Sequence, residues 1–155
     1  MKLLSGILAH GESSKLYNRL IYGKKIAKEA TSYVFGMENV SLFVIDSIMI
    51  NKSKLKKVSA ETDLIIEELR NDISESDVDK IKNAIETYNN LKLQTIVSVS
   101  ERLSHYKTFY NECDLINDEI ERYLEISRTD ISDAMNKYIL NNKRVALNYL
   151  PKEKI

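Results

Sequence analysis

A seam of apolar residues between Val78 and Tyr110 constrains the fold of this chain more than any other feature. Apolar side chains recur there mostly at steps of three and four, the spacing of one face of an α-helix, and only Lys92 interrupts the seam. A single helix of about 30 residues fits this pattern, and at 1.5 Å per residue it would be about 45 Å long, enough to cross a whole domain or leave it. Ser76 and Asp79 resemble a capping box for its first turn. The seam consists of Val78, Ile81, Ile85, Tyr88, Ile96, Val99, Leu103, Tyr106 and Tyr110.

The residues before the seam predict a β-hairpin followed by a helix. Ala30 to Phe35 and Ser41 to Ile50 are rich in β-branched and aromatic residues, and a short turn beginning at Gly36 separates them. The helical period returns at Ser53 and should end near Asn71. We therefore expect two antiparallel strands followed by an amphipathic helix that packs on them.

The ends of the chain add short elements. Two short helices precede the hairpin, over residues 2–9 and 14–21, and two more follow the seam, over residues 113–126 and from a cap at Thr129 onward. Val145, Leu147 and Tyr149 then alternate as a last strand before Pro151. This order predicts an α+β fold, in which an antiparallel sheet made of the hairpin plus a C-terminal strand packs on several helices, one of them long.

Composition limits the classes of function. A chain of 155 residues that is 43% hydrophobic can bury one core, so we predict a single domain over residues 1–155. Its 23 basic and 23 acidic side chains balance, which argues against nucleic acid as a partner. No apolar run approaches the roughly 20 residues of a membrane span. We expect a soluble chain of the bacterial cytoplasm or periplasm.

The sequence offers little chemistry. The histidines His10 and His105 have no carboxylate at a zinc-motif spacing, and Cys113 is the single cysteine. Ser13 lacks the second glycine of a nucleophile elbow. The carboxylates of residues 61–68 fit a solvated helix face. We therefore predict no catalytic residue, no substrate-binding residue, no metal ligand and no cofactor within this chain.

One segment carries a resemblance to a known family. It is similar to the G-x-x-S-R-L-Y-x-x-L signature, with a following K-x-L-A, that marks the second repeat of insulinase-like zinc peptidases of the pitrilysin and mitochondrial processing peptidase type. Four downstream pieces follow the family's order, so that the resemblance covers nearly the whole chain. The signature residues are Gly11, Ser14, Lys15, Leu16, Tyr17, Leu20, Lys24, Ile26 and Ala27, and the downstream pieces are residues 100–106, 117–123, 129–140 and 147–151.

The resemblance implies a non-catalytic unit. Family chains repeat an α+β unit, and the H-x-x-E-H zinc motif sits in the first, which this sequence does not contain, so zinc is expected in a separate catalytic half. Many members supply an arginine and, seven residues on, a tyrosine from the second unit. Those positions are Ile21 and Lys28 here, and neither side chain can play that role. The family unit also opens with a strand, which we expect this chain to lack.

Three hypotheses for function remain open at this point. The first is a structural and interaction domain that forms part of a peptide-enclosing chamber. Its partners would be other domains or a partner chain of the same peptidase family, the peptide substrate in the full assembly, and further copies of itself in a homo-oligomer. The second is a free-standing helical protein–protein interaction module that uses the seam. The third is an enzyme that uses His105 with Tyr106 or Cys113. The hairpin favours the first, because a coiled-coil module needs no strands.

Overall fold

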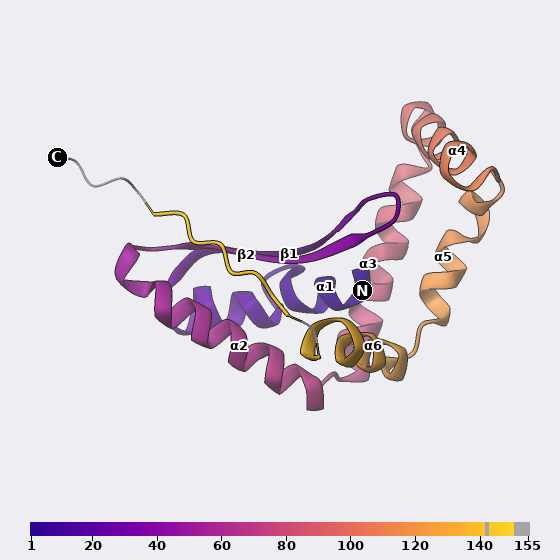
Figure 1. Cartoon of the computed structure of the whole chain (residues 1–155). Coiled ribbons are helices and arrows are strands. Elements are labelled where there is room, and N and C mark those ends of the chain that lie inside the picture. The colour runs from indigo at the N-terminus through magenta and orange to yellow at the C-terminus, as the bar shows by residue number, and fades with distance from the viewer. Residues whose placement is uncertain (142, 151–155) are drawn as a thin grey trace.

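A β-hairpin lies across the middle of the molecule, and helices pack against one side of it (Figure 1). The structure is a computed structural model that describes residues 1–141 and 143–150. The strands β1 (Ala27–Gly36) and β2 (Ser41–Met49) pair antiparallel, from Gly36 opposite Ser41 to Ala27 opposite Met49, with one irregularity near Lys28. The predicted α+β class and the predicted hairpin are confirmed.

The hairpin has one covered and one uncovered face, because successive side chains of a strand point to opposite sides. On the inner face, Ala30, Phe43 and Ile45 pack against the buried core. On the outer face, Leu42 and Ile48 remain about half exposed, at 55% and 48%. The second strand therefore carries apolar side chains on both faces although only one face is covered.

The core forms around α1 (Lys2–Ala9), which lies beneath β1 and also contacts α3 (Figure 1). Its apolar residues Leu3, Leu4, Ile7 and Leu8 are all buried, which is expected of a short helix enclosed on several sides. The π-helical segment η1 (Tyr17–Gly23) follows and adds Leu20 to the same core.

Two further helices close the core. The short η2 (Lys52–Lys54) leads into α2 (Leu55–Asn71), which ends where the sequence predicted and buries Val58, Ile65 and Leu69. Near the end of the described chain, α6 (Arg128–Met135) buries Ile131 and Met135 and continues into η3 (Asn136–Leu140). The predicted cap at Thr129 is wrong by two positions, because the side chain of Ser127 accepts a hydrogen bond from the Asp130 amide and forms a capping box.

The single long helix predicted for the seam is wrong. The structure divides it into α3 (Glu75–Lys92) and α4 (Ile96–Tyr110), and Ser74, not Ser76, caps the first of them. The break falls next to Lys92, where the seam lacks an apolar side chain whose burial would hold a continuous helix. Thr95 then restarts the helix, since its hydroxyl accepts a hydrogen bond from the Ser98 amide at 3.3 Å.

The predicted C-terminal strand is also wrong. Residues 143–150 form no strand, and Val145, Leu147 and Tyr149 are 96%, 78% and 86% exposed. Alternation fixes which side chains would share a face, but a strand also needs a neighbour to pair with. Here Arg144 forms an ion pair with Asp63, with 2.9 Å between Nη2 and Oδ2, which ties the segment to α2. Pro151 lies outside the described residues.

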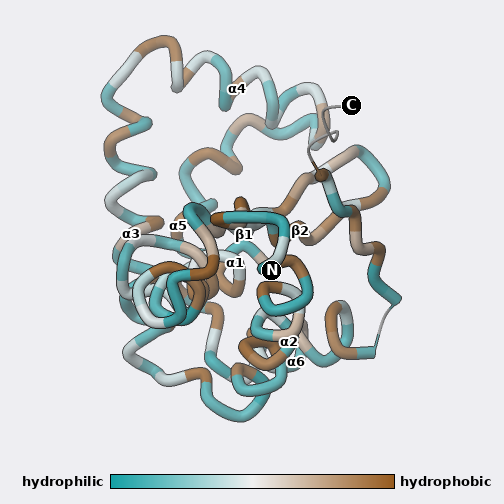
Figure 2. Tube along the Cα trace, turned by 90° about the vertical axis from the view of Figure 1, so that its left-hand side faces the viewer, coloured by the Kyte–Doolittle hydropathy of each residue, from teal (hydrophilic) through white to brown (hydrophobic). Residues whose placement is uncertain are grey.

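The helices α4 and α5 (Leu115–Glu125) project from one end of the molecule (Figure 1). Neither contains a buried residue, and α4 lies at the edge of the molecule, away from α2 and α6 (Figure 2). Within the described chain, no helix has the length and hydropathy needed to cross a membrane.

Candidate functional site

The residues that could bind a metal are scattered. His10 lies exposed at the end of α1, His105 lies exposed on α4, and Cys113 is exposed in the loop after α4. Among residues 1–141 and 143–150, no group of three or more His, Cys, Asp or Glu side chains is arranged to hold a metal ion. Because zinc needs at least three converging protein ligands, the described residues do not fit a zinc site.

The surroundings of His105 do not resemble a catalytic site. Its ring lies against Phe109, with centroids 5.0 Å apart, and beside Tyr106 at 5.6 Å. The Tyr106 hydroxyl donates a hydrogen bond to Glu119 at 2.5 Å, and Arg102 also bonds to that carboxylate. Burial and the nearby Glu119 raise the pKa of Tyr106 to about 12, so its phenol is held neutral. A nucleophile or base would need the opposite shift.

The two positions that correspond to the family's arginine and tyrosine have different surroundings. Ile21 is half-buried in η1 and packs against the core. Lys28 is exposed at the irregularity of β1, where the register of the hairpin shifts. Ile21 therefore serves packing, and Lys28 presents an ammonium group to solvent.

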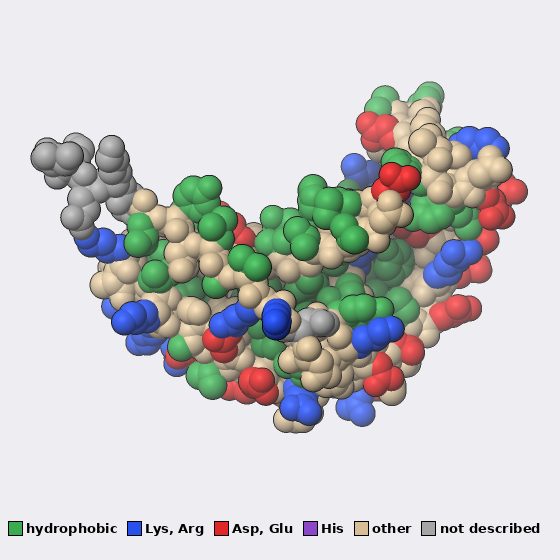
Figure 3. Space-filling view, in the orientation of Figure 1, with side chains coloured by type: hydrophobic (Ala, Val, Ile, Leu, Met, Phe, Trp, Pro, Cys, Tyr) green, Lys and Arg blue, Asp and Glu red, His purple; other side chains and the backbone are tan. Residues whose placement is uncertain are grey.

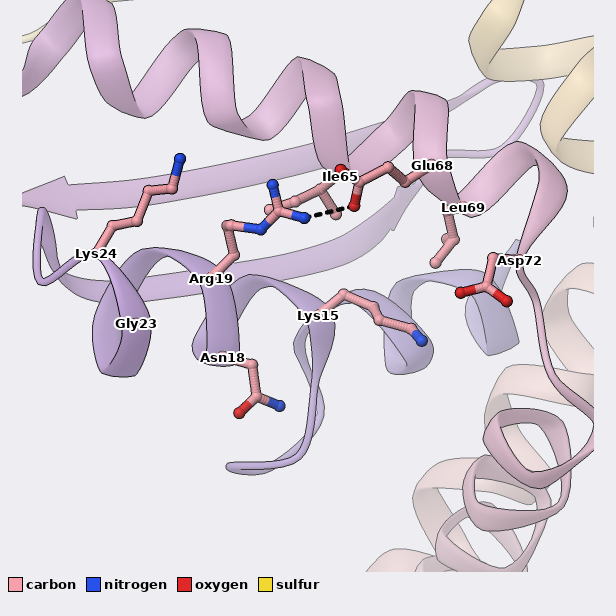
Figure 4. Close-up of a pocket in the computed structure, with 9 residues that line it drawn as sticks. All are labelled: Lys15, Asn18, Arg19, Gly23, Lys24, Ile65, Glu68, Leu69 and Asp72. Carbon is pink, nitrogen blue, oxygen red and sulfur yellow. Dashed lines mark hydrogen bonds and ion pairs between the residues drawn. The ribbon is translucent and has the colours of Figure 1, made fainter.

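A cleft of about 420 Å³ lies between η1 and α2 (Figure 4). Lys15 and Arg19 reach from the chain around η1 toward α2, and Arg19 forms an ion pair with Glu68, with 2.5 Å between Nη2 and Oε2. Arg19 and Lys24 both bond to Glu61, deeper on the same helix. Lys15 pairs with Asp77 instead, at 3.0 Å. The basic groups of the cleft are thus matched by carboxylates of the same chain.

Glu61 is the centre of this network. Its hydrogen bond from Lys24, together with one from Arg19, holds the pKa of the carboxyl below its usual value, although burial alone would raise it. Burial also opposes the charge on Arg19, but its bonds to Glu68 and Glu61 raise the pKa of the guanidinium. Because every one of these charges is paired, the cleft fastens η1 to α2 and offers no free charge to an anionic ligand.

The prediction that Glu61 lies on a solvated helix face is wrong. Glu61 is only 7% exposed. The signal was present, because position 61 falls on the stripe of Val58 and Ile65 at helical spacing. A carboxylate that is buried on such a stripe is almost always paired with a basic group.

The outer face of the hairpin is a candidate contact surface. The register places Tyr33 opposite Val44 and Phe35 opposite Leu42, so that their side chains share this face. Figure 3 shows apolar side chains along the floor of a hollow over the hairpin, with α3 and α4 rising at one end. The exposed apolar side chains gather toward the turn, and the polar pair Thr31 and Asp46 on the same face separates them from Ile48. Clusters of exposed apolar side chains mark sites of contact with other molecules. The apolar residues of the outer face that are about half exposed are Tyr33, Phe35, Leu42 and Ile48.

Comparison with protein families gives one match. A model of the peptidase M16 inactive domain matches residues 1–85, which include α1, η1, the hairpin and α2. No curated protein sequence matches the chain.

Several solved structures share the fold. The inactive peptidase domain of a predicted zinc protease from Bordetella parapertussis superposes with a TM-score of 0.87 at 19% identity, covering 99% of this chain and 82% of that one. A protease from Helicobacter pylori gives a TM-score of 0.74 at 23% identity, covering 88% of this chain and 33% of that one. A peptidase M16 inactive domain from Pseudomonas fluorescens gives 0.74 at 18%, covering 89% and 32%. The chain thus spans about a third of the length of two of these three proteins.

Proposed function

The chain belongs to the peptidase M16 family as an inactive peptidase domain, and from this premise we propose that its hairpin forms a wall of the chamber in which a zinc peptidase encloses its peptide. The domain is not catalytic on its own. Zinc and its general base would come from a separate catalytic half, which is the partner we propose for this domain.

The uncovered apolar face of the hairpin carries this proposal. Peptides of different sequence present different side chains. A surface that binds many of them therefore depends on broad apolar contacts more than on contacts to particular side chains. Tyr33 and Phe35 supply aromatic contact area there, and Leu42 and Ile48 supply aliphatic area. The hollow seen in Figure 3 would let a peptide lie against this face while the catalytic half closes over it.

Peptide binding by the full chain tests the proposal. The probe is an unstructured 20-residue peptide of mixed composition with a fluorescein label, and binding is followed by anisotropy at low salt. We expect weak binding, with a Kd on the order of 100 µM, because a two-stranded face offers little more than apolar contact. Leu42→Asp and Ile48→Asp should each weaken it about tenfold or more.

The chain contains a matched control for these variants. Leu64 on α2 is 49% exposed, against 48% for Ile48, but it is not part of the hairpin. Leu64→Asp should therefore leave binding unchanged. Equal losses in Leu64→Asp and Ile48→Asp would show that net charge, not the hairpin face, governs binding, and would remove the support for the proposal.

The alternative of a free-standing helical module would need the whole seam to be open to a partner helix, and it is not. Val78 and Ile81 are buried inside the chain, at 1% and 2% exposure, and cannot meet a partner helix. The seam leaves apolar side chains in the open only further along, at Tyr88 of α3, which is 62% exposed, and at Ile96 and Tyr110 of α4, which are 86% and 61% exposed.

A further inference from the structure

The helix α4 is attached to the rest of the molecule by one side only. On that side, Arg102 and Tyr106 both bond to Glu119 of α5, as described above. The other side carries a shallow groove whose lining residues all belong to α4 itself. At the ends of this groove, Val97 is 69% exposed and Phe109 is 58% exposed. Exposed apolar side chains that gather on one face mark sites of contact with other molecules, which makes this side of α4 a candidate.

Four residues follow one another along this open face at steps of four. They are Val97, Glu101, His105 and Phe109, so that the face runs from an aliphatic side chain through a carboxylate and an imidazole to an aromatic ring. We name these four residues the α4 row. Small side chains flank the row at Ser100, Ser104 and Thr108 and would allow a second helix to approach closely.

The α4 row is complementary to itself when reversed. If two copies of α4 lie antiparallel and cross at the middle of the row, between Glu101 and His105, Val97 of one copy meets Phe109 of the second copy, and Glu101 meets His105. Because the arrangement is two-fold symmetric, both contacts occur twice. The helix dipoles are then also opposed, which is the favourable orientation.

We propose that the α4 row is a self-association surface, on which α4 of a second copy of this chain lies antiparallel. This goes beyond the chamber wall proposed above, because it uses a different element and does not depend on peptide binding. A contact along one helix of 15 residues is small beside an ordinary protein interface, so we expect a weak dimer with a Kd on the order of 100 µM.

A pair of charge variants tests the geometry. In His105→Glu, carboxylates at positions 101 and 105 would face each other across the dimer. In the double variant Glu101→Lys with His105→Lys, two ammonium groups would do so. Each variant alone should therefore associate about tenfold more weakly than the wild type in sedimentation equilibrium. Mixed in equal amounts, the two should form a heterodimer at least as tight as the wild-type dimer, since each acidic position then meets a basic one.

The mixing step separates this proposal from a change in folding, because neither chain is altered when the other is added. Asn117→Glu, at an exposed position of α5 outside the row, is the matched control and should sediment like the wild type. Circular dichroism of each variant establishes that it is folded. A wild-type chain that stays monomeric to 1 mM, or variants that do not associate when mixed, would overturn the proposal.

Discussion

At the scale of single residues, the charges of this chain act mainly on its stability. Glu61 is buried, paired with two basic groups and placed on the apolar stripe of α2. Tyr106 and Arg102 share the carboxylate of Glu119 and fasten α4 to α5. The pKa of Glu61 is lowered and that of Tyr106 is raised, and each of these two shifts predicts a range of pH in which the fold loses stability.

The first prediction concerns Glu61. Because its folded pKa lies below the ordinary value of 4.5, the pair stabilises the fold above that pH and the contribution is lost as the pH falls through the lower, folded pKa. Glu61→Gln should therefore unfold more easily at pH 7 and differ less from the wild type at pH 3. Urea denaturation at both values measures this. Glu67→Gln, an exposed neighbour on α2, is the control and should behave as the wild type does.

The second prediction concerns Tyr106. Its pKa is raised to about 12 in the folded chain from an ordinary value of 10, so the neutral phenol is favoured by folding. The resulting stability is complete below pH 10 and declines as the pH rises from 10 toward 12. Tyr106→Phe should lose less free energy of unfolding over this interval than the wild type. A steeper loss in the variant would contradict the assigned hydrogen bond to Glu119.

At the scale of elements, close packing between helices depends on small residues. A Cβ atom built on Gly6 of α1 would lie 2.8 Å from Cγ2 of Ile81 on α3, and that methyl group is on a branched carbon that cannot easily move. The glycine therefore sets the distance between these two helices. Elsewhere in a helix, replacing glycine by alanine would stabilise it by about 1 kcal/mol.

The third prediction follows from this contact. Gly6→Ala should destabilise the chain by about 1–3 kcal/mol because of overpacking, and Ile81→Ala by about 2–5 kcal/mol because of the cavity. The double variant should cost clearly less than the sum, since alanine at 6 fills space that Ile81 vacates. Chemical denaturation of the four chains gives the coupling energy. If the free-energy changes of the two single variants simply added, α1 and α3 would adjust their distance without cost, and Gly6 would not set it.

Most elements could be predicted from the sequence because local pattern determines them. The hairpin follows from β-branched composition and a short turn, and the end of α2 follows from the loss of period after Asn71. The length of the seam helix could not be predicted, because periodicity continues in register across a break of three residues. The signal for the break was Lys92 on the apolar side, followed by a capping threonine.

The absence of a C-terminal strand and the presence of the ion-pair cleft could not be predicted, for a different reason. Val145 and Leu147 alternate as strand residues do, but pairing depends on which strand edge is within reach, and sequence alternation does not encode that. The partners Arg19 and Glu61 are far apart in the chain, so nothing local connects them. Only the position of Glu61 on a buried stripe could have indicated that it needed a basic partner.

At the scale of the whole molecule, the match to the peptidase M16 inactive domain makes this a domain that is not catalytic on its own. As a fourth prediction, calorimetry should detect no zinc binding at micromolar concentration, and a fluorogenic peptide should not be cleaved by the pure chain. The reason is that no three ligands converge within residues 1–141 and 143–150. Turnover that a chelator abolishes would contradict this, provided that the activity follows the chain through gel filtration.

The last prediction separates the two faces of the hairpin, on which the proposed chamber wall depends. Leu42 and Phe43 are adjacent in β2, but Leu42 lies on the outer face and is 55% exposed, whereas Phe43 packs against the core. Because Leu42 stays about half exposed in the folded chain, Leu42→Asp should change the free energy of unfolding by less than about 0.5 kcal/mol. Phe43→Asp should cost at least about 3 kcal/mol, since it removes core contacts and places a carboxylate among apolar side chains. Urea denaturation of both variants measures the contrast. If Leu42→Asp were as damaging as Phe43→Asp, the outer face would be needed for folding, and its apolar side chains would no longer indicate a surface kept for contact with another molecule.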